Sequence, residues 1–183
     1  GVMYHTQNSD AILGASAFSG SSNLEKVYLS YNNKIIPKHA FDGCISLHTL
    51  EFNIIEEIHD YAFRNNKKLS GFEIPATVKS IGRKAFYNCD ALTEIHIPSN
   101  VTKIGRKAFG GIEDIDEVSL YYLSKRQQVS DYFEKEAIAG LETLTYYNAK
   151  TIPNRFCDGC ESLSNLTIVG SPTTIGKYAF RNN

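Results

Sequence analysis

The sequence predicts a repeat solenoid of the α/β type, in which short parallel strands and tight turns alternate around each coil. A hexapeptide that ends in Ala-Phe recurs along the chain, and apolar residues follow each copy at fixed positions. A fixed period of about 20 to 50 residues is typical of solenoids and related repeat proteins. Within the copy at 81–97 the apolar residues are separated by 5, 3, 3, 3 and 2 positions. Neither a helix nor a strand has this spacing throughout, so the conformation must change within each copy.

The phenylalanine of the hexapeptide measures the length of the repeat. Between Phe18 and Phe109 it recurs at intervals of 23, 22, 23 and 23 residues. The segment 152–160 joins the same series if Phe156 takes the alanine position and Cys157 takes the phenylalanine position. The next copy of the hexapeptide then follows after a regular interval of 23 residues.

Residues 1–183 are predicted to form a single domain of about seven repeats of 22–24 residues, with a truncated eighth. Because the chain opens at glycine and stops within a repeat, we expect it to be a piece of a longer protein. The repeat is irregular at 121–147, where apolar residues four positions apart predict a short helix that ends at Gly140. Such an insertion carries recognition in some solenoids and is sequence drift in others. The apolar residues of this predicted helix are Val129, Phe133 and Ala137.

Downstream of each phenylalanine the apolar residues keep the spacing L-x-x-L-x-L, which is the register of leucine-rich repeats. Each repeat is therefore interpreted as one coil, with a short strand, a turn, an inward apolar residue and a tight Ala-Phe segment on the opposite side. One coil cannot bury its own apolar side, so stacked neighbours must supply the core. The apolar triplets are Leu24, Val27 and Leu29; Leu47, Leu50 and Phe52; Leu69, Phe72 and Ile74; Leu92, Ile95 and Ile97; Ile115, Val118 and Leu120; Leu163, Leu166 and Ile168.

Residues 81–109 follow the pattern IGxxAFxxCxxLxxIxIPxxVxxIGxxAF almost completely. With this pattern the chain resembles the BspA-like, or Treponema pallidum-type, class of leucine-rich repeat proteins over roughly residues 12–183, and departs from it at 121–140. The resemblance implies a right-handed coil with a parallel β-sheet on the concave face and short helical, 3-10 or irregular segments on the convex side. It also implies a cell-surface or secreted protein that adheres to host matrix proteins or to other cells.

The outward positions of the strands are the candidates for partner binding, because alternate side chains of a strand point to opposite sides. Parallel strands about 4.8 Å apart stack these positions into columns. A protein or a glycan is the partner that we expect on this face. The candidate contact residues are Tyr28, Glu51, Glu73, Glu94, His96, Glu117, Tyr121 and Tyr147.

An acidic strip is predicted on this face, formed by Glu51, Glu73, Glu94 and Glu117. Solvated glutamates keep an exposed sheet soluble, which is a purely structural interpretation. The functional interpretation is a docking surface for a basic partner, because complementary charge steers association. A calcium site is disfavoured, since no loop of the D-x-D-x-D-G type holds the carboxylates in ligand geometry.

A tyrosine cluster is predicted at the irregular repeat, formed by Tyr121, Tyr122 and Tyr147. Tyrosine combines a large contact area with a polar tip and is enriched at interface hot spots. Alternatively, these rings cover the exposed edge of the core at the irregular repeat. Tyr146 differs from them, because it falls in an inward position and is predicted to be part of the core.

The turn before each Ala-Phe segment is basic, so the two sides of the coil carry opposite charge. A polyanion such as a glycosaminoglycan could bind this basic side, but a scattered charged surface is the simpler explanation. A net charge of -1 argues against a nucleic-acid partner. No apolar run approaches the length of about 18 residues that a membrane span needs. The basic residues are Lys38, Arg83, Lys84, Arg106, Lys107 and Lys177, with Arg64, Lys67 and Lys68 just after Phe63.

The four cysteines are too few for a disulfide scaffold in a chain of this length. Cys44, Cys89 and Cys160 share one repeat position, which predicts buried thiols that pack against the next coil. Cys44 and Cys89 are two coils apart, which is too far for a disulfide. Cys157 and Cys160 could form a redox pair or half of a zinc site, but the chain lacks the thioredoxin-like unit and the second ligand pair that these require.

No catalytic, cofactor-binding or metal-binding residue is predicted. The histidines at positions 5, 39, 48, 59 and 96 share no ligand or triad spacing. His96 lies beside Glu94, but on an open face without a pocket that would desolvate the pair. Gly-rich phosphate loops, the G-x-S-x-G elbow and the H-E-x-x-H motif are absent from the sequence. We therefore expect a protein that is not an enzyme and that uses no cofactor.

Two functions follow from these observations. The first is a non-enzymatic interaction protein that binds its partner through the strand face. The second is a structural spacer that projects other domains from a surface and binds nothing itself. In addition, Ile175 and Phe180 in the truncated last repeat have no following coil, so self-association through the C-terminal coil is expected.

Overall fold

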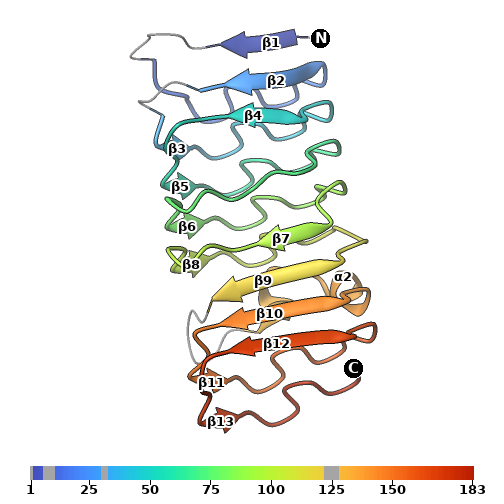
Figure 1. Cartoon of the computed structure of the whole chain (residues 1–183). Helices are drawn as coiled ribbons and strands as arrows, with labels where there is room; N and C mark the ends of the chain where they lie inside the picture. Colours follow the sequence, from blue (N-terminus) through green and yellow to red (C-terminus); the bar gives the residue numbers. More distant parts are fainter. Residues whose placement is uncertain (1, 6–10, 30–32, 122–127) are drawn as a thin grey trace.

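The chain folds as a stack of parallel coils, and one side of the stack carries most of the longer strands. The computed structural model describes residues 2–5, 11–29, 33–121 and 128–183, without the side chains of 2–5 and 136. These strands are β1 (Val2–His5), β2 (Leu24–Tyr28), β4 (Thr49–Glu51), β7 (Glu94–His96), β9 (Glu117–Tyr121), β10 (Thr143–Tyr147) and β12 (Asn165–Val169). One sheet has the order β1-β2-β4 and the other has the order β12-β10-β9-β7, and all their strands are parallel (Figure 1). The predicted repeat solenoid is confirmed.

A second ladder of two-residue strands runs along another side of the coils. Its members are β3 (Ile35–Ile36), β5 (Glu57–Ile58), β6 (Ser80–Ile81), β8 (Lys103–Ile104), β11 (Thr151–Ile152) and β13 (Thr174–Ile175). The first four pair in sequence, and β11 pairs with β13. In this ladder, the second residue of β3, β5, β6, β8 and β11 is a buried isoleucine, which confirms the predicted inward position. The sequence indicated only a turn here, and the structure adds the backbone pairing.

The Ala-Phe segments form a third set of bonds between coils. The N–H groups of Phe63 and Phe86 donate to the carbonyl oxygens of Ala85 and Ala108, each at 2.7 Å. Residues two positions before and two positions after the phenylalanine adopt positive φ in each regular coil. Glycine and asparagine tolerate this left-handed region best, which explains why the later position holds only these two residue types. They are Gly20, Gly43, Asn65, Asn88, Gly111, Gly159 and Asn182.

The phenylalanine rings of successive coils stack into a column that runs through the core. The ring centroids of neighbouring phenylalanines from Phe18 to Phe109 are 5.3–5.5 Å apart, with interplanar angles of 15° or less. Large aromatic side chains bury much apolar surface, so one phenylalanine in each coil fixes the spacing of the stack. The inward residues of the strands pack against this column and complete the core.

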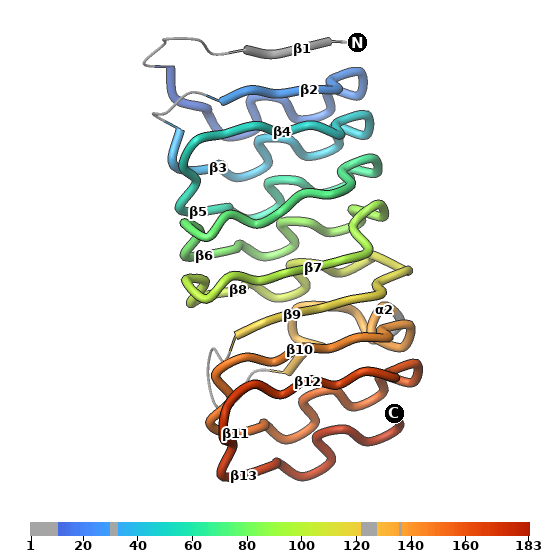
Figure 2. Tube along the Cα trace, in the orientation of Figure 1, coloured from blue at the N-terminus to red at the C-terminus, as the bar shows by residue number. Residues whose placement is uncertain are grey.

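The irregular coil contains two short helices instead of the single predicted helix. They are α1 (Val129–Tyr132) and α2 (Lys135–Ala139), and Gly140 is the C-cap of α2 as predicted. Figure 2 shows α2 interrupting the regular path of the chain between β9 and β10. Phe133 lies between the helices, and its ring stacks on Phe109 at 5.5 Å. The column therefore continues through this coil, and Phe133 is its reference residue.

The alignment of segment 152–160 with the repeat is confirmed by its hydrogen bonds. The N–H of Cys157 donates to the carbonyl of Ala179 at 2.7 Å, as the phenylalanine N–H does in the regular coils. Arg155 and Gly159, two residues on either side, have φ of 54° and 90°. Cys157 thus occupies the phenylalanine position, while Phe156 fills the alanine position, and both are buried.

The cysteines behave in two ways, one of which the sequence did not predict. Cys44 and Cys89 are free and buried as expected, and their thiols donate to the carbonyls of Phe18 and Phe63 at 3.0 Å. Burial raises the pKa of Cys44 to about 11 and that of Cys89 to about 12, so both remain protonated at neutral pH. Cys157 and Cys160 are also buried but form a disulfide, with Cα atoms 5.7 Å apart. Packing alone was therefore an incomplete expectation for this pair.

Candidate interaction face

The strand face is the outward side of the longer strands, together with the coil at 69–76 that lies between β4 and β7. The strand registers place several predicted contact residues side by side. Tyr28 is opposite Glu51 across β2 and β4. Glu94 is opposite Glu117 and His96 is opposite Ser119 across β7 and β9. The structure therefore brings the predicted residues together as local pairs along the face.

The four glutamates of the predicted acidic strip are distributed over two columns. Glu94 and Glu117 share the first outward column, whereas Glu51 lies opposite Tyr28 in the second. The repeat alignment places Glu73 in the column of Glu51. The four glutamates therefore do not form one continuous column. Like charges are adjacent only within each column, where they repel one another.

His96 is the centre of a polar contact on this face. Its Nδ1 lies 2.9 Å from Oγ of Ser119, and its Nε2 lies 3.9 Å from a carboxylate oxygen of Glu94. The side chains of Glu94 and His96 are 67% and 52% exposed. This exposure leaves the pair hydrated, which suits surface recognition better than proton transfer in a desolvated site.

Tyr121 and Tyr147 form a stacked aromatic pair at the irregular coil. Their ring centroids are 4.7 Å apart with an interplanar angle of 20°. Both side chains are partly exposed, because they occupy opposed outward positions of β9 and β10. Tyr146 is buried and its ring lies 4.5 Å from Phe156, which confirms its predicted place in the core. Tyr122, which the sequence groups with this pair, lies outside the described residues.

The coil at 69–76 has no strand, although the sequence predicted one in every coil. Its absence divides the strand face into the two sheets, since β4 and β7 each lack a pairing partner on this side. Gly71 has φ of 62° and supplies the signal that would have identified the break, whereas a proline at the position of Pro75 also follows β7 as Pro98. Glycine weakens a strand.

An open groove with a volume of about 670 Å³ lies along this break. It extends from β4 to the strandless coil and reaches Pro98 in the following coil. Leu50, Phe52 and Phe72 line the groove and are only partly buried, whereas the matching residues of β2, β7, β9 and β10 and just after them are buried. The break therefore exposes apolar core residues on the strand face.

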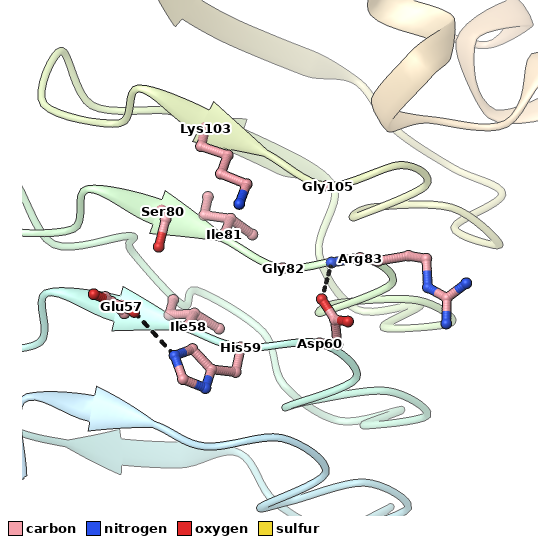
Figure 3. A pocket seen from close by; sticks show the side chains of 10 residues that line it. All are labelled: Glu57, Ile58, His59, Asp60, Ser80, Ile81, Gly82, Arg83, Lys103 and Gly105. Atoms are coloured by element: carbon pink, nitrogen blue, oxygen red, sulfur yellow. Dashed lines mark hydrogen bonds and ion pairs between the residues drawn. The ribbon is translucent and has the colours of Figure 1, made fainter.

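A second groove of about 450 Å³ lies on the two-residue ladder at β5, β6 and β8 (Figure 3). The ring of His59 contacts Glu57 at 2.9 Å, and the N–H of Arg83 donates to Asp60 at 2.7 Å. A Cβ added at Gly82 would collide with the backbone of Asp60, so glycine permits this close packing of coils. The His59–Glu57 contact lies within one coil, whereas the Arg83–Asp60 bond joins two coils.

Many basic residues on the Ala-Phe side are paired with carboxylates of neighbouring coils. Arg64 binds Asp42 through two nitrogens at 2.9 and 2.6 Å. Burial alone would raise the pKa of Asp42, but the hydrogen bonds from Arg64 and His39 outweigh it and lower that pKa. The same bidentate geometry recurs between Arg181 and Asp158. Lys67 with Asp90 and Lys107 with Glu134 form two further pairs. Part of the basic charge on this side is thus paired between coils.

The described residues were also compared with the requirements of a metal site and of a membrane-spanning helix. Within the described residues, no group of three or more His, Cys, Asp or Glu side chains could hold a metal ion. Across the same part of the chain, no helix has the length and apolarity that a membrane span requires.

Comparison with known proteins agrees with this geometry. Stacked short parallel strands with an aromatic column define a leucine-rich repeat solenoid. The model of the BspA type leucine rich repeat region matches in six copies, over residues 11–137 and 56–183. The chain belongs to the BspA-type leucine-rich repeat family, which is consistent with a role in protein interaction. No curated protein matches the chain.

Two of the solved structures that are similar to the chain show its fold. A leucine-rich repeat protein of T. pallidum shares 26% sequence identity at a TM-score of 0.60 over 90% of this chain. A leucine-rich repeat protein of Bacteroides ovatus ATCC 8483 shares 20% identity at a TM-score of 0.56 over 93% of this chain, and this likeness concerns the fold alone. The chain spans 66% of the first protein and 67% of the second.

Proposed function

We propose that this chain is a non-enzymatic interaction module that binds a protein or glycan partner through its strand face. The observation that carries the proposal is the partly exposed Tyr121–Tyr147 pair, which lies on the same sheet as the exposed residues Glu94 and His96. Aromatic anchors bordered by charged side chains are typical of interface hot spots. The stacked coils hold these residues on rigid strands, which reduces the entropy lost on binding.

The setting of the proposed function is the cell surface or the extracellular space. Family membership supports this setting and supports adhesion to host matrix proteins or to other cells. In this setting we expect a basic partner surface, because Glu51 and Glu117 lie on the outward side of the strands and form no ion pair with another described residue.

Binding of the purified chain to a panel of extracellular-matrix proteins and glycans tests the proposal. The variant with Tyr121→Ala, Tyr147→Ala and Glu94→Lys should lose binding to whichever panel member the wild type captures. Tyr178→Ala and Glu161→Lys are matched controls, because both residues are exposed and lie away from the strand face. Equal binding by the triple variant and the wild type would contradict binding through the strand face.

A structural spacer is the second candidate function. The column of stacked phenylalanines from Phe18 to Phe133 and the ion pairs between coils favour it, because both stiffen the stack. A spacer would capture no member of the panel, and lengthening the stack by one repeat would leave its function intact. The panel experiment therefore separates the two functions.

Self-association through the C-terminal coil is a further part of the proposal. Leu166 and Ile175 of this coil are 41% and 62% exposed, although their register partners Leu144 and Ile152 in the preceding coil are buried. Exposed apolar patches of this kind are typical of contact surfaces. A second copy that covers this coil would appear in light scattering as a mass that rises with concentration, and a constant monomer mass would contradict it.

A further inference from the structure

The break in the strand face leaves a row of backbone groups without partners. Among the described residues, no backbone hydrogen bond involves residues 71–74. Elsewhere on this face the ladder continues beyond the strands, for example from the N–H of Ile97 to Ser119 at 2.8 Å. Open backbone groups beside a sheet are the feature that an extended peptide uses when it docks by strand addition.

The floor of the groove at this break is apolar and anchored. The ring of Phe72 lies 5.4–6.0 Å from the rings of Phe52, Phe63 and Phe86. This aromatic cluster holds the strandless segment against the core while its backbone stays unpaired. Because this aromatic and aliphatic floor is partly exposed, covering it with an apolar side chain of a partner would contribute favourable free energy of binding.

The rim of the groove is acidic. Glu73 belongs to its lining, and Glu51 lies between two of the lining residues. Both side chains are exposed, and neither forms an ion pair with another described residue. His48, which also lines the groove, contacts the hydroxyl of Thr49 at 3.0 Å. The charge at the rim therefore favours a cationic occupant.

We propose that this groove binds a short extended segment of a partner protein in which apolar side chains are flanked by lysine or arginine. The apolar side chains cover Leu50, Phe52 and Phe72. The backbone of the segment hydrogen-bonds with residues 71–74, and the long basic side chains bend toward Glu51 and Glu73. The inference rests on the proposed function and specifies one partner chemistry and one place on the strand face.

The probe for this proposal is the blocked peptide acetyl-Lys-Val-Thr-Val-Lys-amide, titrated into isotope-labelled protein and followed by amide chemical shifts in NMR. Shift changes are expected at residues 48–52 and 71–76. Two control peptides separate charge from apolar contact, one with glutamate in place of both lysines and one with serine in place of both valines. Each control should bind at least about fivefold more weakly, because each lacks one of the two contacts.

Variants of the protein complete the test. Glu73→Lys should weaken peptide binding at least about tenfold, and Glu73→Gln should weaken it less, because it removes the charge without reversing it. Glu161→Lys is the matched control and should bind as the wild type does. The proposal that the groove binds the peptide would be wrong if the peptide did not bind or if shift changes were confined to other residues. It would also be wrong if the glutamate peptide bound equally well, or if Glu161→Lys weakened binding as much as Glu73→Lys.

The groove proposal and the proposed function can be disproved independently of each other. If the matrix or glycan partner is lost in the Tyr121, Tyr147 and Glu94 variant while the lysine peptide never reaches the groove, the face binds and the groove inference is wrong. If the peptide occupies the groove and no panel member binds the wild type, the groove stands and the choice of matrix and glycan partners is wrong.

Discussion

The ring of Phe133 stacks on the ring of Phe109 at 5.5 Å, close to the 5.3 Å spacing between Phe86 and Phe109. The irregular coil therefore carries the same aromatic contact as the regular coils despite its two helices. We expect Phe133→Ala to destabilise the chain as much as Phe86→Ala, by about 3–5 kcal/mol in urea unfolding. Phe180→Ala is the control, because its ring is partly exposed and should cost less than half as much. A cost below about 1 kcal/mol for Phe133→Ala would show that this coil is loosely packed.

The cost of placing a residue other than glycine at a positive-φ position of the Ala-Phe segment can be tested at a site where the added methyl group changes no packing. Gly20 has φ of 76°, and a Cβ added there meets nothing within 4 Å. Gly20→Ala should therefore cost about 1–2 kcal/mol through the left-handed backbone alone. Gly14→Ala is a matched control, because its Cβ also meets open space and its φ lies outside the positive region. Equal melting temperatures for the two variants would contradict this explanation of the repeated glycine and asparagine position.

The Asp42–Arg64 pair predicts a loss of stability in acid. Because the pKa of Asp42 is lowered in the folded chain from its ordinary value of 3.8, the pair stabilises the fold above that value. This contribution is lost as the pH falls below 3.8 through the folded pKa. Asp42→Asn should flatten the dependence of unfolding free energy on pH in this range. A slope in Asp42→Asn equal to that of the wild type would contradict this explanation.

Reduction of the Cys157–Cys160 disulfide should have a modest effect. The bond closes a loop of only a few residues, so the loop-entropy relation gives a contribution of about 2 kcal/mol. Thermal melting with and without a reductant is expected to show a lower melting temperature and a cooperative transition in both cases. The Cys157→Ser and Cys160→Ser double variant should melt like the reduced wild type and should not respond to the reductant.

Much of the fold could be predicted because each coil repeats one apolar spacing. Residues of the triplets such as Val27, Ile95 and Val118 are buried where the register places them. The break at 69–76 was missed, because pairing depends on the neighbouring backbone as well as on the apolar spacing. Gly71, with φ of 62°, weakens that pairing, while the apolar residues of the segment keep the pattern of a strand.

The candidate site was less predictable than the fold. The outward positions follow from strand alternation, but the columns depend on the register between coils, which separates Glu51 from Glu94. The disulfide was missed for a similar reason. Cys160 fits the repeat position of the free thiols, and only the tight turn through Gly159 reveals that Cys157 lies within bonding distance.

Hydrogen exchange with and without a bound panel partner tests whether the chain binds through the strand face. Binding there should slow exchange at the strands that carry the face residues, namely β7, β9 and β10, and at the break between β4 and β7. Exchange in the Ala-Phe segments should stay unchanged, because these segments lie on the opposite side of the coils. Protection confined to the Ala-Phe segments, or spread evenly over all coils, would contradict binding through the strand face.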